Sequence, residues 1–354
     1  MIRKKIKSNK KDWIKAIVIA LLFIWFINSF IIQSYSVNSN NMEDSFYPGD
    51  YILVNKIKFG VRLPITILSL PFIGNKIPFT KTNSYLEWIT LPYFRIFEFS
   101  DIKRNDILLI NSPFEDDSPI DKKIKSVKRC VGLPSDTLLI LNKKVFVNNK
   151  MIKFNENIKY KYRVITNGEK IPDEIINKYN LSMGGTISEG VYDYFLTPQI
   201  TDSLLKYPII KSIKLLRIYK YEDNYFTFPH NPLYGWNDDF FGPVIVPKKN
   251  SVVALNKKNI DLYKRIIQKY ENNSLEIKGD SILINNKITK EYKFQSDYYF
   301  VMDDNRDNSF DSRQWGFLPE DHIIGSASFL WFSLNKSKNV KNHVRWNRIL
   351  KAIN

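Results

Sequence analysis

The chain has 354 residues, of which 44% are hydrophobic and 14% aromatic, so most of it is expected to fold around a large core. Its single cysteine, Cys130, excludes an internal disulfide, and three scattered histidines make a zinc site of Cys and His ligands unexpected. The net charge of +17 suggests nucleic acid or anionic lipid as a partner. However, the lysines are spread along the chain and no arginine-rich run carries interleaved aromatics, so no nucleic-acid partner is predicted.

The first predicted element is an apolar helix from Trp13 to Ile32. About twenty such residues, at 1.5 Å each, span the roughly 30 Å hydrocarbon core of a bilayer. The basic residues before it predict a cytoplasmic N-terminus, with a basic tail at 1–12 and an anchor at 13–33. The alternative is a cleaved export signal ending near Ser34 and Ser36, for which the apolar region is long. We favour the uncleaved anchor and predict a single span.

Strand signals dominate the rest of the chain. Short β-branched runs, separated by Asn, Asp, Gly and Pro, lie at 50–57, 105–112, 125–133, 136–149, 250–256 and 280–289. Residues 138–150 and 275–287 each predict a hairpin with a polar turn, and 256–272 predicts a helix. The fold class is therefore mainly β.

Four segments stand out, in order, by their dense polar and turn residues. They are SNNMEDSFYPGDYILVNKIKFG (39–60), KRNDILLINSPFEDD (103–117), SVKRCVGLPSDTLLI (126–140) and DDNRDNSFDSRQWG (303–316). Together they resemble the signature boxes of bacterial type I signal peptidases (leader peptidases). The segments VRLPITILSLPFIG (61–74) and KTNSYLEWITLPYFR (81–95) are similar to the longer form found in Bacteroidetes.

The resemblance implies a signal-peptidase fold of antiparallel sheets. The catalytic β core would comprise residues 34–155 and 283–335, with an inserted second domain at 156–282, which lacks the family's motifs. Residues 336–354 would form a basic C-terminal tail, either solvated or resting on anionic lipid. The implied activity is a serine endopeptidase that removes signal peptides from exported preproteins, without metal or cofactor. Its partners would be signal peptides and the lipid bilayer, and its place the outer (periplasmic) face of the cytoplasmic membrane, as a single-pass protein.

The resemblance also assigns site residues. Lys128 matches the general base, a lysine that must be neutral although its ordinary pKa lies near 10.4, so it needs an apolar setting. Ser309 matches the serine that orients this base, Ser39 the hydroxyl that stabilises the oxyanion, and Asp311 and Arg313 a buried supporting pair. The positions that match the shallow pockets for small substrate residues are Tyr35, Val37, Met42, Phe46 and Val127.

The sequence departs from the family at the position of the nucleophile, which is Asn41 here. An amide has no hydroxyl and cannot form an ordinary acyl-enzyme. Ser39, roughly 6–7 Å away along an extended chain, could replace it only if the register slipped by two residues. Two family glycines are Asp303 and Ser135; the first also brings a carboxylate near Lys128. The alternative to an active enzyme is therefore a signal-peptidase-like pseudoenzyme that binds signal peptides without cleaving them.

Overall fold

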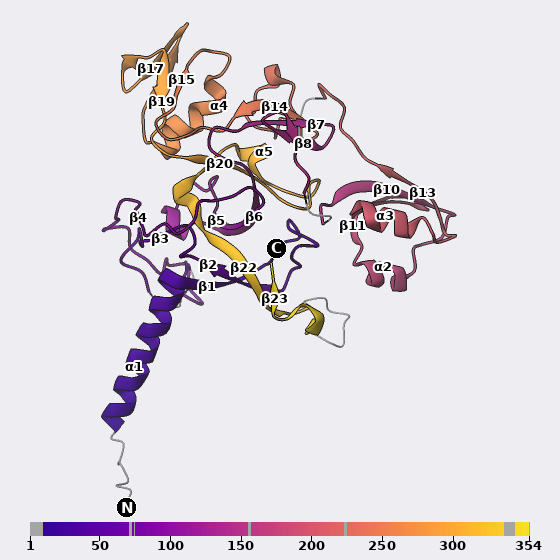
Figure 1. Cartoon of the computed structure of the whole chain (residues 1–354), viewed down its shortest axis with the longest axis horizontal. Coiled ribbons are helices and arrows are strands. Elements are labelled where there is room, and N and C mark those ends of the chain that lie inside the picture. Colours follow the sequence, from indigo (N-terminus) through magenta and orange to yellow (C-terminus); the bar gives the residue numbers. More distant parts are fainter. Residues whose placement is uncertain are drawn as a thin grey trace, which may run out of the picture.

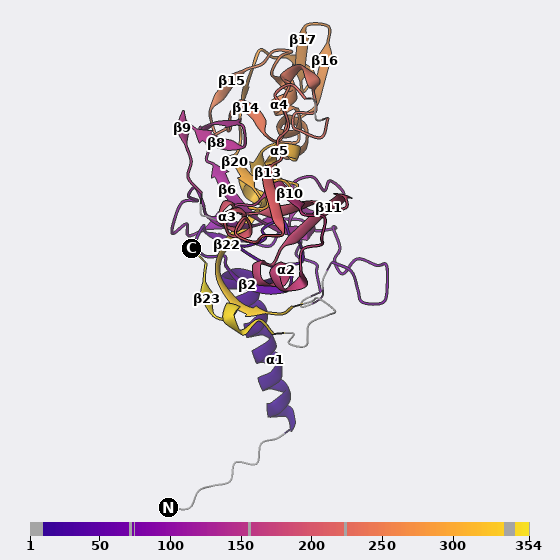
Figure 2. The ribbon, with the colours of Figure 1, turned by 90° about the vertical axis from the view of Figure 1, so that its right-hand side faces the viewer.

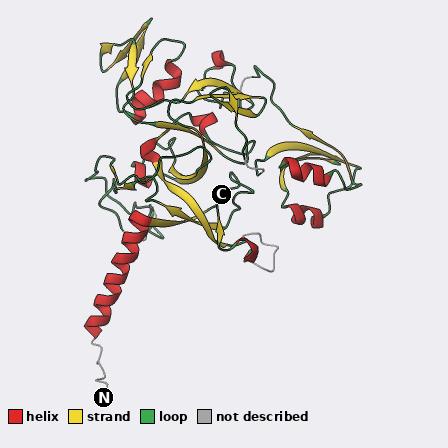
Figure 3. Cartoon of the chain, in the orientation of Figure 1, coloured by secondary structure: helices red, strands yellow, loops and turns green. Residues whose placement is uncertain are grey.

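The computed structural model describes residues 10–70, 73, 75–154, 157–222, 225–335 and 344–353. Most of the predicted tail at 1–12, the predicted domain boundary at 155–156 and part of the predicted tail at 336–354 lie outside these residues. Strands predominate beyond the first helix (Figure 3), so the mainly β class is confirmed.

The N-terminal helix projects away from the rest of the molecule in both views (Figures 1 and 2). It consists of α1 (Lys10–Phe26) and a π-helical turn (Ile27–Ile31). None of these 22 residues is fully buried in the molecule, and among the described residues they form the only helix long and apolar enough to cross a membrane. The apolar helix predicted from Trp13 to Ile32 is therefore present, starting three residues earlier.

The main sheet is antiparallel and has the order β1-β2-β22-β5-β6-β20-β21, with β23 added beside β22. Its strands are β1 (Ile32–Ser36), β2 (Asp50–Asn55), β5 (Ile107–Asn111), β6 (Lys125–Gly132), β20 (Tyr298–Met302), β21 (Leu318–Pro319), β22 (Ile323–Ser333) and β23 (Lys351–Ala352). Strand β5 is buried on both faces: Ile107 and Leu109 join one hydrophobic cluster, whereas Leu108 and Ile110 join another. This alternation is the period of two that a strand imposes.

A second group of sheets packs around the largest hydrophobic cluster, at the end of the molecule opposite α1 (Figure 1). Its elements are β7 (Thr137–Leu141), β8 (Lys144–Val147), β9 (Lys150–Met151), β14 (Phe240–Ile245), β15 (Val252–Ala254), α4 (Ile260–Arg265), a π-helical turn (Ile266–Tyr270), β16 (Leu275–Lys278), β17 (Ser281–Ile284), β18 (Lys287–Ile288) and β19 (Glu291–Lys293). The pairs β7–β8 and β16–β17 are the two predicted hairpins, and α4 with its π-helical turn is the predicted helix.

A separate four-stranded sheet has the order β11-β12-β10-β13 and its own hydrophobic cluster. It is built from β10 (Tyr160–Thr166), α2 (Asp173–Tyr179), β11 (Ser182–Ser188), β12 (Val191–Leu196), α3 (Pro198–Leu204) and β13 (Ile210–Leu215). This unit lies to one side of the main sheet in Figure 1. It accounts for only part of the predicted insertion at 156–282. Strand β14 lies within that range but pairs with β7, which lies in the predicted core. The division into domains stays a prediction.

The remaining elements are short. They are β3 (Val61–Arg62), β4 (Arg95–Ile96), α5 (Ser312–Trp315) and 3-10 turns at Ile120–Lys122, Pro232–Tyr234, Glu320–His322 and Trp346–Arg348. Residues 344–353 pack against the main sheet instead of forming a free tail. Strand β23 pairs with β22, and Arg348 forms an ion pair of 2.6 Å with the fully buried Asp50.

Candidate active site

The segment that follows β1 carries Asn41 in a turn rather than in a strand. The Phe46 amide donates to the Met42 carbonyl at 2.7 Å, and the Glu43 amide donates to the Asn40 carbonyl at 3.1 Å. The extended spacing assumed between Ser39 and Asn41 is therefore not the conformation of this segment, because it bends at residues 39–40. The turn is also held from outside, since the Asn305 amide donates to the Asn41 carbonyl at 2.9 Å.

Lys128 lies in the middle of β6, opposite Leu108 of β5, and its side chain is only 4% exposed. Its Nζ donates to Oδ2 of Asp303 at 2.6 Å and to the carbonyl of Phe310 at 2.9 Å. The expectation that Asp303 brings a carboxylate near Lys128 is thus met by direct contact. An ionised carboxylate at this distance stabilises an ammonium rather than a free amine.

Asp303 is fully buried, and its second carboxylate oxygen has no hydrogen-bond partner in the described part of the chain. Burial raises the pKa of Asp303 to about 7, although the positive charge of Lys128 partly opposes this rise. The replacement of the family glycine by Asp303 causes no backbone strain, because Asp303 is not among the described residues with positive φ. The other glycine replacement, Ser135, does have a positive φ of 76°.

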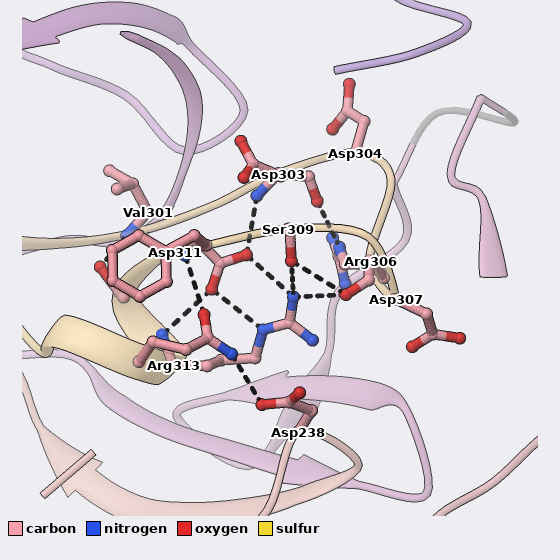
Figure 4. A network of polar contacts seen from close by, with 12 residues as sticks. Asp238, Val301, Asp303, Asp304, Arg306, Asp307, Ser309, Asp311 and Arg313 are labelled. Atoms are coloured by element: carbon pink, nitrogen blue, oxygen red, sulfur yellow. Dashed lines mark hydrogen bonds and ion pairs between the residues drawn. The ribbon is translucent and has the colours of Figure 1, made fainter. Parts of the chain in front are cut away.

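Asp311 and Arg313 form a second buried pair, next to Asp303 of the first pair (Figure 4). Asp311 accepts from Nε and Nη2 of Arg313 at 3.0 and 2.9 Å and from the Asp303 amide at 3.0 Å. It also caps α5 through the Arg313 amide. Burial alone would raise the pKa of Asp311, but the charge and hydrogen bonds of Arg313 outweigh it and lower the pKa to about 2.

Ser309 was expected to contact Lys128 but makes different contacts. Its hydroxyl donates to the Arg306 carbonyl at 3.0 Å and accepts from Nη2 of Arg313 at 2.6 Å (Figure 4). Among the described residues, the two polar partners of the Lys128 amine are Asp303 and Phe310, so Ser309 does not touch it here. The reason is that Arg313 holds the hydroxyl while Asp303 binds the amine. The orienting role of Ser309 stays a prediction.

A groove of about 330 Å³ brings several predicted residues together. The residues that line it are Tyr35, Asn38, Ser39, Asn41, Ile110, Ser112, Pro113, Phe114, Ile124, Lys125, Ser126, Lys128, Phe310 and Trp315. Tyr35 also donates its hydroxyl to the Lys125 carbonyl at 2.8 Å. The groove thus joins the nucleophile position, Ser39 and the predicted base at one surface.

The other predicted pocket residues lie in the core rather than at the groove surface. Val37, Met42, Phe46 and Val127 are buried in one hydrophobic cluster. From the sequence alone, a core residue and the wall of a shallow pocket look alike, because both are apolar. Their contact with substrate stays a prediction. Cys130 is also buried, and burial raises the pKa of its thiol, as suits a core residue.

Several residues of the site were missed from the sequence. Phe114 and Phe310 meet edge to face, with ring centroids 4.8 Å apart, at the rim of the groove. The nucleophile turn is supported by the fully buried Lys159, whose Nζ lies 3.3 Å from Asp44 and 3.6 Å from Glu43. The amide of Lys159 also donates to the Asp304 carbonyl at 3.0 Å, which couples the start of β10 to the polar loop. Nothing in the sequence signals a contact across more than a hundred residues.

Comparison of the sequence with known proteins identifies its family. The sequence model of the family described as "Signal peptidase, peptidase S26" matches residues 10–197 and 245–332. Signal peptidase I of Buchnera aphidicola subsp. Baizongia pistaciae is 26% identical over 323 residues, covering 90% of this chain and 75% of the relative. Signal peptidase I of Helicobacter pylori is 24% identical over 357 residues, covering 97% and 91%. Signal peptidase I of Haemophilus influenzae is 51% identical over a shorter stretch of 51 residues, which is 14% of this chain and 15% of the relative. The chain therefore belongs to the signal peptidase family, peptidase S26, among the bacterial type I enzymes.

Proposed function

We propose that α1 holds this protein in the cytoplasmic membrane, with the N-terminus in the cytoplasm and the groove on the outer face. The groove would receive the cleavage-site segment of a signal peptide as an added strand. Support comes from β6: β5 pairs with it along 125–129, whereas β20 pairs with it only along 129–132. Among the described strands, none pairs with residues 126–128 on that second side, and Ser126 and Lys128 of this stretch line the groove.

With a serine at position 41, this geometry suits a Ser–Lys mechanism. The neutral amine of Lys128 would take the hydroxyl proton while the oxygen attacks the scissile carbonyl, and Ser39 would stabilise the oxyanion. The protonated Lys128 would then give its proton to the leaving amine. Water would hydrolyse the resulting ester, again with Lys128 as base.

One observation carries the proposal for the chain as it stands: Asn41 and Lys128 line the same groove, and the Lys128 amine is bound to Asp303. The amide cannot act as the nucleophile, and the carboxylate stabilises the protonated base. Serine and asparagine are both small and polar, so the groove keeps room for a peptide. We therefore propose that the protein binds signal peptides but cleaves them at least ten-thousandfold more slowly than its Asn41→Ser version, since loss of a nucleophile costs about a millionfold in the best-studied serine enzyme.

The test compares cleavage and binding of one preprotein by the purified protein and by Asn41→Ser. Equal binding with cleavage only by Asn41→Ser is the expected result. Asp303→Gly, added to Asn41→Ser, should raise cleavage further by removing the carboxylate from the Lys128 amine. Brisk cleavage by the unaltered protein would contradict the proposal.

A second candidate uses Ser39 as the nucleophile, because Ser39 is exposed and lines the same groove as Lys128. In that case the unaltered protein cleaves and Ser39→Ala stops it. If the unaltered protein cleaves and its Ser39→Ala variant, which still has Asn41, also cleaves, a serine–lysine mechanism is wrong for this chain.

A further inference from the structure

A second cavity, of about 360 Å³, lies where the anchor helix meets the rest of the protein. One wall is formed by the end of the helix, with Trp25, Asn28 and Ser29. The other walls are β3 with the loop after it, and the turn that leads into β6. In Figure 1 this place lies at the junction of α1 with β3 and β4.

Four cationic side chains line this cavity: Lys56, Arg62, Lys122 and Lys125. The only carboxylate in the lining is Asp121, which accepts from the amide and the hydroxyl of Thr66 at 3.0 and 2.8 Å. Within the described part of the chain, none of the four cations forms an ion pair. The lining therefore carries a formal charge of about +3 without a counterion.

The contacts that the cations make in the described part of the chain include no ion pair, although Asp121 attracts Arg62, Lys122 and Lys125 through space. Arg62 donates to the Asp321 carbonyl at 2.8 Å and to the side-chain oxygen of Asn111 at 3.0 Å, both neutral acceptors. Burial, together with repulsion by Lys125 and Arg62, lowers the pKa of Lys56 to about 7. Burial, together with repulsion by Arg62 and Lys122, lowers the pKa of Lys125 to about 8. A bound anion would relieve both effects.

The position of the cavity indicates which anion fits. Lys56 donates to the carbonyl of Asn28 at 3.2 Å, so the cations lie at the end of the apolar helix, where the hydrocarbon core gives way to lipid head groups. The neighbouring loop exposes large apolar side chains on this side of the chain, among them Ile67 and Leu70 in the cavity wall and Trp88, which is 83% exposed. Exposed apolar groups beside cations are typical of a surface that rests on lipid.

We propose that this cavity binds the phosphate of an anionic phospholipid in the outer leaflet. Lys125 lines both this cavity and the peptide groove, so a bound lipid would hold the groove at the membrane surface. The net positive lining would prefer a lipid with a net negative charge over a zwitterionic one, although both carry a phosphate. This assignment rests on the membrane anchoring proposed above.

The test uses the full-length protein in nanodiscs of phosphatidylcholine with a minority of phosphatidylglycerol. Native mass spectrometry counts the lipids that each protein retains after release. The cavity variant is Lys56→Gln/Lys122→Gln/Lys125→Gln, which leaves Arg62 and its structural contacts intact. The matched control changes three exposed lysines near β15 and on β18, far from α1 in Figure 1: Lys248→Gln, Lys249→Gln and Lys287→Gln.

The parent and the control should retain phosphatidylglycerol in preference to phosphatidylcholine. The cavity variant should lose that preference by about tenfold or more, since each cation near a membrane surface adds appreciable affinity. Equal preference in all three proteins would overturn the proposal. Displacement of the lipid by inorganic phosphate at a similar concentration would also overturn it, because the site would then serve a soluble anion.

Further measurements distinguish failure of the lipid-site proposal from misfolding of the variant and from failure of the proposed function. If the triple variant does not fold, as judged by circular dichroism, the single variants Lys56→Gln and Lys125→Gln should each lower the preference by about fivefold, and no change in either would overturn the assignment. A protein that binds no signal peptide but keeps its phosphatidylglycerol preference contradicts the proposed function alone. A parent that does not incorporate into nanodiscs contradicts the anchoring, and with it the lipid site.

Discussion

Two buried carboxylates, Asp303 and Asp311, lie eight residues apart and both pair with a cation, yet their pKa values move in opposite directions. Asp311 receives three hydrogen bonds from Arg313 and one from a backbone amide, and its pKa falls to about 2. Asp303 receives one from Lys128, its second oxygen has no hydrogen-bond partner among the described residues, and its pKa rises to about 7.

This difference shows that a nearby cation does not by itself stabilise a buried charge. Burial costs both carboxylates a large desolvation energy, and only Asp311 has enough donors to repay it. The charge of Asp311 also raises the pKa of Asp303 further. The pair that matches the family pattern is therefore satisfied, and the pair created by this chain's own replacement of glycine is not.

The largest expected effect concerns Lys128, the cation of the unsatisfied pair. In an Asn41→Ser background, Lys128→Met should lower cleavage of a preprotein by about ten-thousandfold or more, because the base is lost while an apolar side chain of similar length fills its place. Thermal unfolding of both proteins checks that the fold survives. Near-normal cleavage by the double variant would contradict the assignment of Lys128 as base.

The next largest effect is expected when the Asp311–Arg313 pair is broken. Asp311→Asn should lower the free energy of unfolding by about 3 kcal/mol, because Arg313 keeps its buried charge without a counterion. Urea unfolding of the detergent-solubilised chain measures this loss. The folded pKa of Asp311 is depressed, so its stabilisation is present above the unfolded pKa near 4 and is lost only as the pH falls towards 2. The loss caused by Asp311→Asn should therefore change less between pH 5 and pH 8 than the effect of Asp303→Asn; what change there is comes from Asp303, whose raised pKa depends in part on the Asp311 charge.

Asp303→Asn should behave in the opposite way. The folded pKa of Asp303 is raised to about 7, so its contribution to stability is full below the unfolded pKa near 4 and is lost as the pH rises through 7. Relative to the parent, Asp303→Asn should therefore gain about 2 kcal/mol in free energy of unfolding between pH 5 and pH 8. The same urea titrations measure it, with Ser135→Gly, which changes no charge, as the control. A pH-independent difference would show that Asp303 is ionised at both pH values.

The sequence predicted the parts of this comparison that depend on local patterns. The runs at 105–112 and 125–133 contain β5 and β6, because short β-branched and apolar runs bounded by Asn, Asp, Gly and Pro favour strands. The family resemblance put Asp311 and Arg313 together as a buried pair, and they are in contact. The carboxylate of Asp303 beside Lys128 was also expected, from its place in the last signature box.

Contacts that depend on side-chain competition could not be predicted. Ser309 bonds to Arg313 instead of Lys128, since the long guanidinium reaches both Asp311 and the serine. Lys159 was missed because its partner Asp44 is distant in sequence and lysines are common throughout this chain. The cationic cavity was missed for the same reason: only the fold brings Lys56 and Lys125 together.

The smallest expected effect comes from Ser135, the other replaced glycine, and it separates backbone cost from charge. Ser135 has φ of 76° and an exposed side chain, so Ser135→Gly should raise the free energy of unfolding by up to about 1 kcal/mol, because only glycine adopts this conformation without strain. Ser135→Ala is the matched control and should give no gain, since alanine keeps the Cβ atom that causes the strain. Urea unfolding at pH 5 and pH 8 should give the same value for Ser135→Gly, because no charge changes. A gain that varies with pH, or an equal gain from alanine, would show that the backbone conformation is not the cause.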